Sequence, residues 1–233
     1  EGIIQSLNAR RTPEQQAQLV AAATALDAFF AEAMAERRKT PRDDLISDMV
    51  QLQAGGAELT DSEVSVNLQS LLVGGNLTTT DLIGNGVIAF LRNPSELAKL
   101  KADPKLIAAA IEEILRYDPP ISMTGRVASR DLEIRGETVG AKDILLNQLR
   151  AANRDPSVYE NPDRFDITRK HVPHMAFGGG AHICIGAPLA RMEGQAALLK
   201  LFNRFPNLKL AEQTLTYRAL PGFRGVETLI VEP

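Results

Sequence analysis

The sequence predicts a mainly α-helical fold with a small β-sheet at one side. Two capping boxes, at 12–15 and 60–63, each precede a long run with apolar residues at helical spacing. A further helical run covers 185–205. Alternation of apolar and polar residues is confined to 126–150 and to the tail, so strands are expected to form a minor part of the fold.

The first half of the chain is predicted to form three helices. The first capping box opens a helix over 12–38, and a second helix covers 44–53. The second capping box opens a long helix over 60–91. Gly74-Gly75 and a run of three threonines weaken the middle of that helix, so a kink is expected there.

The second half alternates between regular and irregular chain. A helix starts at Asp103-Pro104 and must end at Pro119-Pro120, because proline cannot continue a helix. Turn glycines within 126–150 indicate a β-hairpin. The stretch 153–183 is rich in proline and glycine and is long, and an irregular stretch of that length is usually functional or disordered. We expect one domain over 1–233.

Composition and charge exclude several classes of protein. The 233 residues carry 26 basic and 29 acidic side chains, a net charge of -3 that lacks the basic excess of a nucleic-acid-binding protein. Cys184 is the single cysteine, which excludes an intramolecular disulfide and a multi-cysteine metal site and fits a reducing cytoplasm. No apolar run reaches the length of a membrane span, about 20 residues. The sequence starts at Glu1 without methionine, so an N-terminal part is expected to be absent.

The segment 177–186 around the cysteine is the most informative in the chain. Four glycines, at 178, 179, 180 and 186, let the backbone approach a flat or bulky group closely. Cys184 stands where a helix begins, and the positive end of a helix dipole favours a thiolate over a thiol. A thiolate is either a metal ligand or a nucleophile.

Three other interpretations of Cys184 stay open at this point. A nucleophile needs a histidine base, and His182 is only two residues away, where local geometry rarely permits that role. A zinc site could draw on His171, His174, His182 and Cys184, although their spacing matches no zinc pattern. A buried structural cysteine is the plainest interpretation, since cysteine is often buried.

The order Phe177, Gly180, Cys184, Gly186 follows the pattern F-x-x-G-x-x-x-C-x-G, which closely resembles the haem-binding loop of the cytochrome P450 family. The resemblance implies haem b as cofactor, with Cys184 as the proximal thiolate ligand of the haem iron. It also places Phe177, Gly178 and Gly186 around the haem.

By position in the family, Arg126 and His182 resemble the residues that bind the haem propionates, where cations pair with carboxylates. An ordinary loop histidine is the alternative for His182. Further matching segments, such as 153–156 and 223–225, stand in family order. The resemblance thus covers nearly the whole chain, as the helix-rich C-terminal half of the cytochrome P450 fold with its small β-sheet.

Glu113 and Arg116 match the E-x-x-R motif of the family, and their i, i+3 spacing places both on one helical face. Most pairs of this spacing are solvated surface pairs. The family completes this pair with an arginine from the irregular stretch, and Arg164 in Pro162-Asp163-Arg164-Phe165 is predicted to take that place. The resemblance implies a buried triad that holds the long loop in register.

The segment 72–80 resembles the helix that forms the oxygen-binding groove in the family. Thr78 aligns with the threonine that helps to deliver protons and is the predicted catalytic residue. The preceding position, normally an acid, is Leu77. Protons then arrive by another route, through Asn76, Asp81 or water, or oxygen activation is impaired. The alternative for Thr78 is a hydrogen bond back to its own helix.

The resemblance implies a monooxygenase that hydroxylates a small apolar organic substrate with dioxygen and electrons from a ferredoxin or flavodoxin, in the cytoplasm. The missing N-terminal half of the same fold would be a further partner. Two rival functions are a haem-binding accessory protein without oxygenase activity and a zinc-stabilised structural helical domain. The expected walls of the substrate pocket are mostly apolar or small: Leu71, Gly74, Gly75, Ile121, Ser122, Met123, Thr124 and Phe223.

Overall fold

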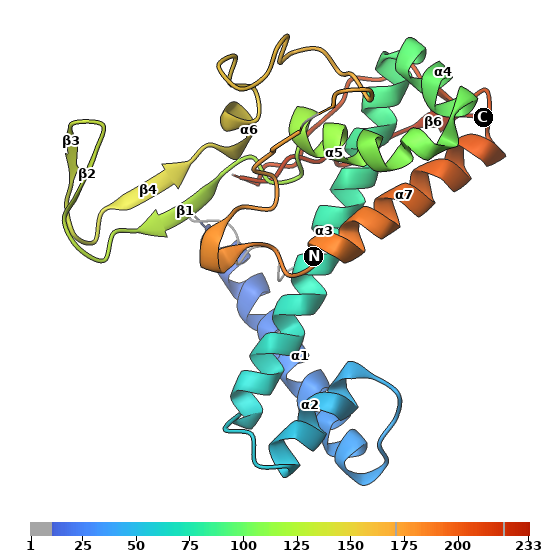
Figure 1. The fold of residues 1–233 in the computed structure, drawn as a ribbon. Coiled ribbons are helices and arrows are strands. Elements are labelled where there is room, and N and C mark those ends of the chain that lie inside the picture. Colours follow the sequence, from blue (N-terminus) through green and yellow to red (C-terminus); the bar gives the residue numbers. More distant parts are fainter. Residues whose placement is uncertain (1–10, 171, 221) are drawn as a thin grey trace. The chain divides into compact units, whose positions relative to one another are not determined.

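The computed structural model describes residues 11–170, 172–220 and 222–233, and helices dominate it (Figure 1). The chain divides into two compact units, the first ending at Leu77 and the second running from Thr78 to Pro233. The helices are α1 Pro13–Lys39, α2 Leu45–Ala54, α3 Asp61–Arg92, α4 Pro94–Ala102, α5 Ile107–Tyr117, α6 Leu149–Ala152 and α7 Ala187–Arg204, with short 3₁₀ turns at Pro104–Leu106 and Gly180–His182. The predicted mainly α fold class is confirmed, while the expectation of a single domain stays a prediction.

The first unit is formed by α1, α2 and the beginning of α3. Thr12 caps α1 in a complete capping box with Gln15, and Asp44 caps α2 by accepting from the backbone N–H of Ser47. Thr60 and Glu63 form the second capping box at the start of α3. The apolar faces of the three helices meet in a small core of Phe30, Met34, Val50, Val64 and Leu68.

α3 continues without interruption through the glycines and threonines in its middle. Gly74 and Gly75 have open space where a Cβ would stand, so no neighbouring side chain among the described residues requires glycine there. Their backbone entropy therefore weakens the helix without ending it. The kink expected at this point stays a prediction.

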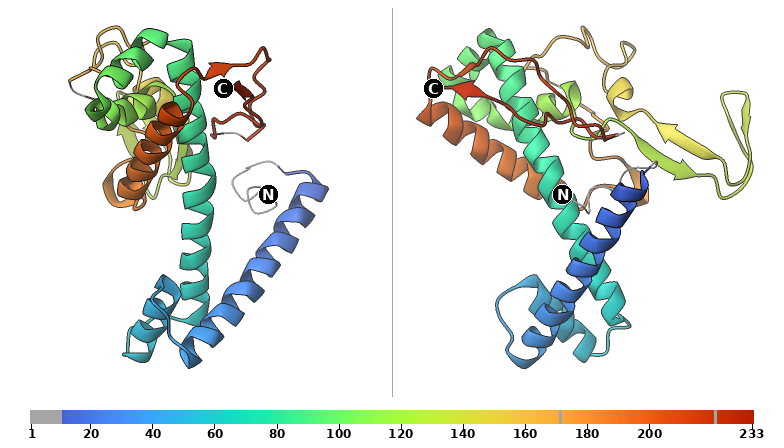
Figure 2. Two further views of the ribbon diagram at one scale, coloured as in Figure 1. Left: turned by 90° about the vertical axis from the view of Figure 1, so that its right-hand side faces the viewer. Right: turned by 180° about the vertical axis from the view of Figure 1, so that it is seen from behind.

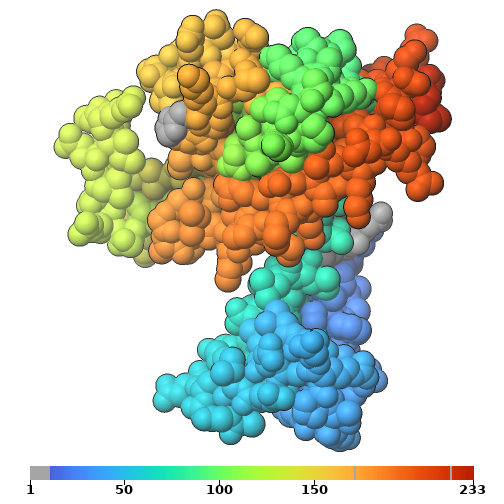
Figure 3. All heavy atoms as spheres, turned by 45° about the vertical axis from the view of Figure 1, so that its right-hand side comes forward, coloured from blue at the N-terminus to red at the C-terminus, as the bar shows by residue number. Residues whose placement is uncertain are grey.

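The core of the second unit lies among the later part of α3, α4, α5 and α7. Phe90 is fully buried and meets the rings of Phe165 and Phe202 edge-on, each with a centroid distance of 5.4 Å. α5 and α7 pack side by side (Figure 3). A Cβ at Gly194 would stand 2.9 Å from Ile111 Cδ1, so the missing side chain lets the two helices approach closely.

Within the described residues of the second unit, the strands form three two-stranded antiparallel sheets. β1 Thr124–Val127 pairs with β4 Ile144–Asn147, and β2 Leu132–Ile134 pairs with β3 Glu137–Val139 at the far end of the same hairpin (Figure 1). The predicted hairpin is confirmed. β5 Lys209–Leu210 and β6 Val231–Glu232 pair in the tail, which confirms strands there.

The tail returns along the later part of α3 (Figure 2). The fully buried Asn85 of α3 donates from Nδ2 to the carbonyl oxygens of Arg224 and Asp118, at 2.8 and 3.0 Å. Ile121 and Phe223 form an isolated β-bridge. The tail therefore closes over the segment that joins α5 to β1.

Among the described residues, α1 is the one helix that is long and apolar enough to cross a membrane by length and composition. This is weak evidence, because the core helices of proteins that never enter a membrane pass the same test.

Candidate functional site

The segment around Cys184 forms a closed loop. The backbone N–H of Cys184 donates to the carbonyl of Phe177 at 3.0 Å, and that of Ile183 donates to Gly180 at 3.2 Å. Gly178 and Gly180 adopt φ angles of 70° and 66°, in the left-handed region that side chains with a Cβ rarely enter. Two of the glycines that the sequence analysis singled out are therefore needed for the shape of the loop.

Cys184 lies directly before α7. Gly186 is the N-cap of that helix, and the backbone N–H of Ala187 donates to the carbonyl of Cys184 at 3.3 Å. The cysteine is exposed, which excludes the buried structural interpretation. A Cβ at Gly186 would stand 3.8 Å from the cysteine Sγ, so the glycine leaves the surroundings of the sulfur open.

Apolar side chains on and beside the loop face outward. Ile185 and Ile183 expose 85% and 63% of their surface, far more than isoleucines in a folded interior. Leu189 and Met175 are exposed as well. An accessible sulfur set among glycines and exposed apolar side chains fits a flat apolar ring that carries a thiolate-binding metal at its centre.

The zinc interpretation finds no support among the described residues. His174 is already engaged, since its Nε2 lies 3.1 Å from Glu112 Oε2 and its Nδ1 accepts from the N–H of Ala176. His171 lies outside the described residues. Within the described ranges, no group of three His, Cys, Asp or Glu side chains could hold a metal ion.

The E-x-x-R pair is buried in the second unit. Arg116 donates to both oxygens of Glu113, from Nε at 2.7 Å and from Nη2 at 2.8 Å, and neither residue is exposed. The same guanidinium donates to three carbonyl oxygens of the irregular stretch, those of Asn153, Pro162 and Arg164. A charge-assisted network of this kind fixes the stretch against α5.

The prediction that Arg164 completes this pair is wrong, and Arg169 occupies the place. Arg169 Nε lies 3.3 Å from Glu113 Oε2, whereas the Arg164 side chain is 62% exposed and lies 3.8 Å from Asp166. Phe165 and Ile167 are buried between the two arginines, and a turn at 167–168, with the N–H of Arg169 donating to the carbonyl of Asp166 at 3.3 Å, precedes the inward-facing Arg169. No local pattern of residue types distinguishes the two arginines.

A second carboxylate on α5 forms a cluster that the sequence analysis missed. Glu112 accepts from Arg191 of α7 through two bonds, at 2.6 and 2.9 Å, and it also faces His174. Burial raises the pKa of Glu112, but hydrogen bonds from His174 and Arg191 outweigh it and lower the pKa to about 2. The guanidinium of Arg191 lies over the ring of Phe177, 4.6 Å from its centroid.

Asn153 connects α5 to the beginning of the cysteine loop. This fully buried side chain donates from Nδ2 to the carbonyl of Leu115 at 3.2 Å and accepts at Oδ1 from the backbone N–H of Met175 at 2.7 Å. The sequence pattern of the segment 153–156 indicates no particular role for this asparagine. Its position predicts a structural one.

The two expected propionate partners are accessible. Arg126 lies on β1 with its side chain exposed, and its Nη1 donates to the carbonyl of Gly125 at 2.8 Å. His182 ends the 3₁₀ turn of the loop and is also exposed. No hydrogen bond joins His182 to Cys184 in the part of the chain that the structure describes, so a nucleophile–base pair is not formed.

The expected pocket residues fall into two groups, one on the segment after α5 and in the tail, and the other on α3. Ile121 and Phe223 pair across the β-bridge, and the N–H of Ser122 donates to the carbonyl of Gly222 at 2.8 Å. Met123 and Thr124 follow directly. Leu71, Gly74 and Gly75 lie on α3 in the first unit, and Thr78 on α3 at the start of the second.

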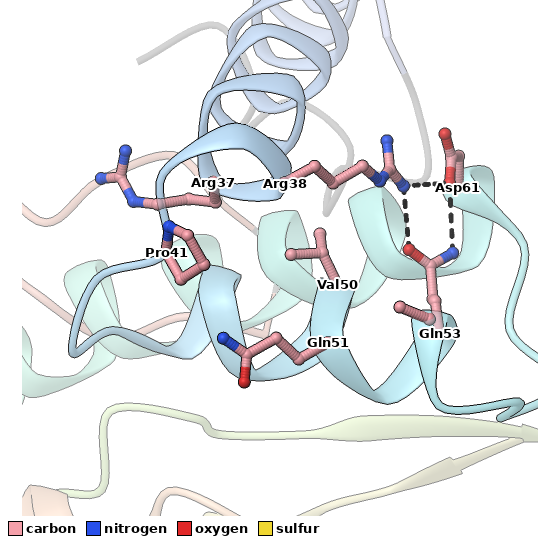
Figure 4. Close-up of a pocket in the computed structure, with 8 residues that line it drawn as sticks. Arg37, Arg38, Pro41, Val50, Gln51, Gln53 and Asp61 are labelled. Carbon is pink, nitrogen blue, oxygen red and sulfur yellow. Dashed lines mark hydrogen bonds and ion pairs between the residues drawn. The ribbon is translucent and has the colours of Figure 1, made fainter.

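A separate pocket lies within the first unit, among the end of α1, α2 and the start of α3 (Figure 4). Arg38 Nη2 donates to Gln53 Oε1 at 2.9 Å and to Asp61 Oδ1 at 2.5 Å, and Gln53 Nε2 donates to Asp61 at 3.1 Å. Because its polar groups bond to one another, the pocket presents few that are free to hold a ligand. It lies outside the unit that carries Cys184 and is not part of the candidate site.

A glycine-rich loop that presents an accessible cysteine before a helix, together with a buried E-x-x-R network, is the arrangement expected of a haem-thiolate class of protein. The family model described as Cytochrome P450 matches residues 4–216. The chain belongs to the cytochrome P450 family. A haem iron is the cofactor that this family implies.

Two curated relatives from Bacillus subtilis (strain 168) illustrate the similarity. The chain is 44% identical to the Biotin biosynthesis cytochrome P450 over 204 residues, which is 88% of this chain and 51% of that protein. It is 39% identical to the Polyketide biosynthesis cytochrome P450 PksS over 206 residues, which is 87% of this chain and 51% of that protein. The chain thus spans about half the length of these relatives.

Solved structures agree with the sequence comparison. The crystal structure of P450BioI in complex with hexadec-9Z-enoic acid ligated acyl carrier protein superimposes with a TM-score of 0.93 at 41% identity, covering 99% of this chain and 59% of that one. The ligand-free structure of Mycobacterium smegmatis CYP164A2 gives a TM-score of 0.93 at 38% identity, covering 99% of this chain and 60% of that one.

Proposed function

We propose that this chain is the haem-binding part of a monooxygenase that hydroxylates an apolar organic substrate with dioxygen. The observation that carries the proposal is the exposed Cys184, held directly before α7 by a loop whose glycines adopt left-handed conformations. Bound haem b would supply an iron centre that activates oxygen, with Cys184 as its proximal thiolate ligand.

The residues of the loop would hold the cofactor in place. Phe177, Gly178 and Gly186 would surround the porphyrin on the cysteine side, where the lack of a Cβ at two of these positions leaves room. Arg126 and His182 are exposed and can donate charge-assisted hydrogen bonds to the propionate carboxylates. These roles follow the matching positions of the family.

Thr78 is the proposed catalytic residue because a hydroxyl both donates and accepts hydrogen bonds and can therefore be one link in a chain that relays protons. It is half-buried on α3. Leu77 before it can do neither, so protons must reach the hydroxyl by another route. Asp81 is an unsuitable source, since its buried carboxylate forms an ion pair with Arg218.

For the substrate and the partners, we propose chemical classes and not individual molecules. Ile121, Met123 and Phe223 offer apolar surface on the paired segments, which favours an apolar substrate. One related structure holds a carrier protein with a fatty acyl chain, so carrier-bound and free acyl chains are the first class to screen. Electrons would come from a ferredoxin or flavodoxin in the cytoplasm. The N-terminal half of the fold would complete the pocket.

A haem-binding accessory protein without oxygenase activity is the second candidate, and Leu77 is the observation that favours it. Such a protein would keep the cysteine loop and the E-x-x-R network while losing proton delivery. Both candidate functions predict bound haem, but only the monooxygenase predicts conversion of a substrate to product.

The test is an absorption spectrum of the reduced, haem-loaded protein with carbon monoxide, combined with a turnover assay on an acyl substrate. We expect a thiolate-type spectrum that Cys184→Ala abolishes and Ala181→Ser, a substitution at an exposed position of the same loop, retains. An unchanged spectrum in Cys184→Ala would refute the proposal. A thiolate-type spectrum without product under any electron supply would favour the accessory protein.

A further inference from the structure

Two adjacent carboxylates on α5 hold two different parts of the site. Successive residues of a helix point about 100° apart. Glu113 accordingly faces Arg116 and Arg169 in the buried network, and Glu112 faces His174 and Arg191. The first carboxylate belongs to the motif described above, while the second has no role in it.

His174 links Glu112 to the backbone just before the cysteine loop by contacting both. Its Nδ1 accepts from the N–H of Ala176 at 3.2 Å, so the ring hydrogen must lie on Nε2, which donates to Glu112 Oε2 at 3.1 Å. The side chain of His174 is 4% exposed. This ring is therefore fixed in one tautomer and one orientation by a carboxylate on one side and a backbone amide on the other.

Arg191 links Glu112 to Phe177, the aromatic residue at the start of the loop. The Arg191 guanidinium donates two hydrogen bonds to the Glu112 carboxylate. Hydrogen bonding to this carboxylate raises the pKa of Arg191. The flat guanidinium lies over the ring of Phe177, a cation–π contact. The carbonyl of Phe177 in turn accepts from the N–H of Cys184 at 3.0 Å.

We propose that Glu112 is a positioning residue that sets the cysteine loop relative to α5 and α7, through His174 on the backbone and Arg191 on Phe177. The role in haem ligation rests on the proposed function, whereas the effect on the loop does not. The positioning role depends on the negative charge of Glu112. A carboxylate accepts from both partners, while an amide has one acceptor oxygen and would present an N–H to a donor.

The experiment compares Glu112→Gln and Glu112→Ala with the wild type and with Glu193→Ala. Glu193 is an exposed glutamate on α7 with no hydrogen bond or ion pair in the described part of the chain, so its loss is a matched control. Two properties are measured on the haem-loaded protein. One is hydrogen exchange of the amides at Ala176 and Cys184, and the other is the fraction of the carbon monoxide complex with a thiolate-type spectrum.

In Glu112→Gln we expect exchange at Ala176 to be about tenfold faster, the factor that corresponds to loss of a typical hydrogen bond. The thiolate-type fraction should decrease, and amides in the core of α4 should keep their protection. Arg191→Lys, which retains the charge but not the bidentate pair, should speed exchange at Cys184, whose N–H donates to the carbonyl of Phe177, and should reproduce part of the spectral effect. Glu193→Ala should change neither.

Unchanged exchange at Ala176 together with an unchanged spectrum in Glu112→Gln would overturn the proposal. Faster exchange everywhere, including α4, would also overturn it, because it would indicate a merely structural role. If Glu112→Ala does not fold, Glu112→Gln and Arg191→Lys decide the result. A wild type without any thiolate-type spectrum would refute the proposed function, and the exchange result would still decide the role of Glu112 in the loop.

Discussion

The backbone N–H of Cys184 donates to the carbonyl of Phe177 across 3.0 Å, which joins the two ends of the glycine loop. The sulfur position is therefore determined by backbone hydrogen bonds more than by the packing of its own side chain, which is exposed. Whatever displaces Phe177 also displaces the cysteine.

Gly178→Ala and Gly180→Ala should each destabilise the protein by about 1 kcal/mol, because an alanine Cβ is unfavourable at positive φ. Gly179→Ala is the matched control, since Gly179 has an extended φ of -171° and only an ordinary contact at 3.9 Å. Unfolding midpoints in denaturant measure the three variants. Equal effects at all three glycines would show that φ is not the cause.

Arg169→Ala should reduce the free energy of unfolding by about 2 kcal/mol, because it removes an ion pair with a buried carboxylate that still retains Arg116, together with hydrogen bonds to three backbone carbonyls. Arg164→Ala should stay within about 0.5 kcal/mol of the wild type, since its side chain is exposed. Denaturant unfolding of both variants checks the assignment. If Arg164→Ala destabilised the protein more than Arg169→Ala, Arg164 and not Arg169 would be the partner of Glu113.

Glu113→Ala should cost roughly 3–5 kcal/mol, because it leaves the guanidinium of Arg116 buried without its carboxylate. Reduced yield of folded, haem-loaded protein is the expected result. Glu133→Ala, at an exposed position of β2, serves as the control and should behave like the wild type. Normal stability of Glu113→Ala would mean that the network contributes little to the fold.

The contribution of Glu112 should depend on pH. Its pKa of about 2 in the folded protein lies below the value near 4.3 of a free glutamate. A lowered pKa stabilises the folded state above the unfolded value, and this stabilisation is lost as the pH falls toward 2. The difference in unfolding midpoint between wild type and Glu112→Gln should therefore be constant near neutral pH and shrink below about pH 4. A difference that grows with acid would contradict the assigned ion pair.

Leu77→Asp should change how efficiently electron consumption leads to product. An acid before Thr78 adds a titrating group to the proton route, so product formed per reduced cofactor should rise, or its pH dependence should change. The half-buried position of residue 77 predicts a modest cost in stability. A fully coupled wild type that Thr78→Ala leaves unaltered would show that protons travel by another route.

Helix starts and the cysteine loop were predictable because their signals are local. A capping threonine and its partner three residues later lie within one turn, as at Thr12 and Thr60. The loop motif is contained in ten consecutive residues. Each of these features depends on neighbours in the sequence, so the pattern of residue types was sufficient.

The partners of the α5 carboxylates were not predictable in the same way. Glu112 meets His174 and Arg191, which are 62 and 79 positions away in the sequence. Several arginines in the irregular stretch had the right chemistry for Glu113, and only burial separates Arg169 from Arg164. Side-chain direction in irregular chain follows from tertiary packing, which residue types alone do not specify.

The separation of these partners along the chain has a consequence for the order of synthesis. When α5 leaves the ribosome, Glu113 finds Arg116 one turn away, but Glu112 must wait for His174 and then for Arg191. Until α7 is made, the apolar face of α5 also lacks Leu198 and Phe202, which join the same core. A nascent chain that ends before α7 therefore holds an unmatched charge beside an uncovered apolar surface, a form suited to recognition by chaperones.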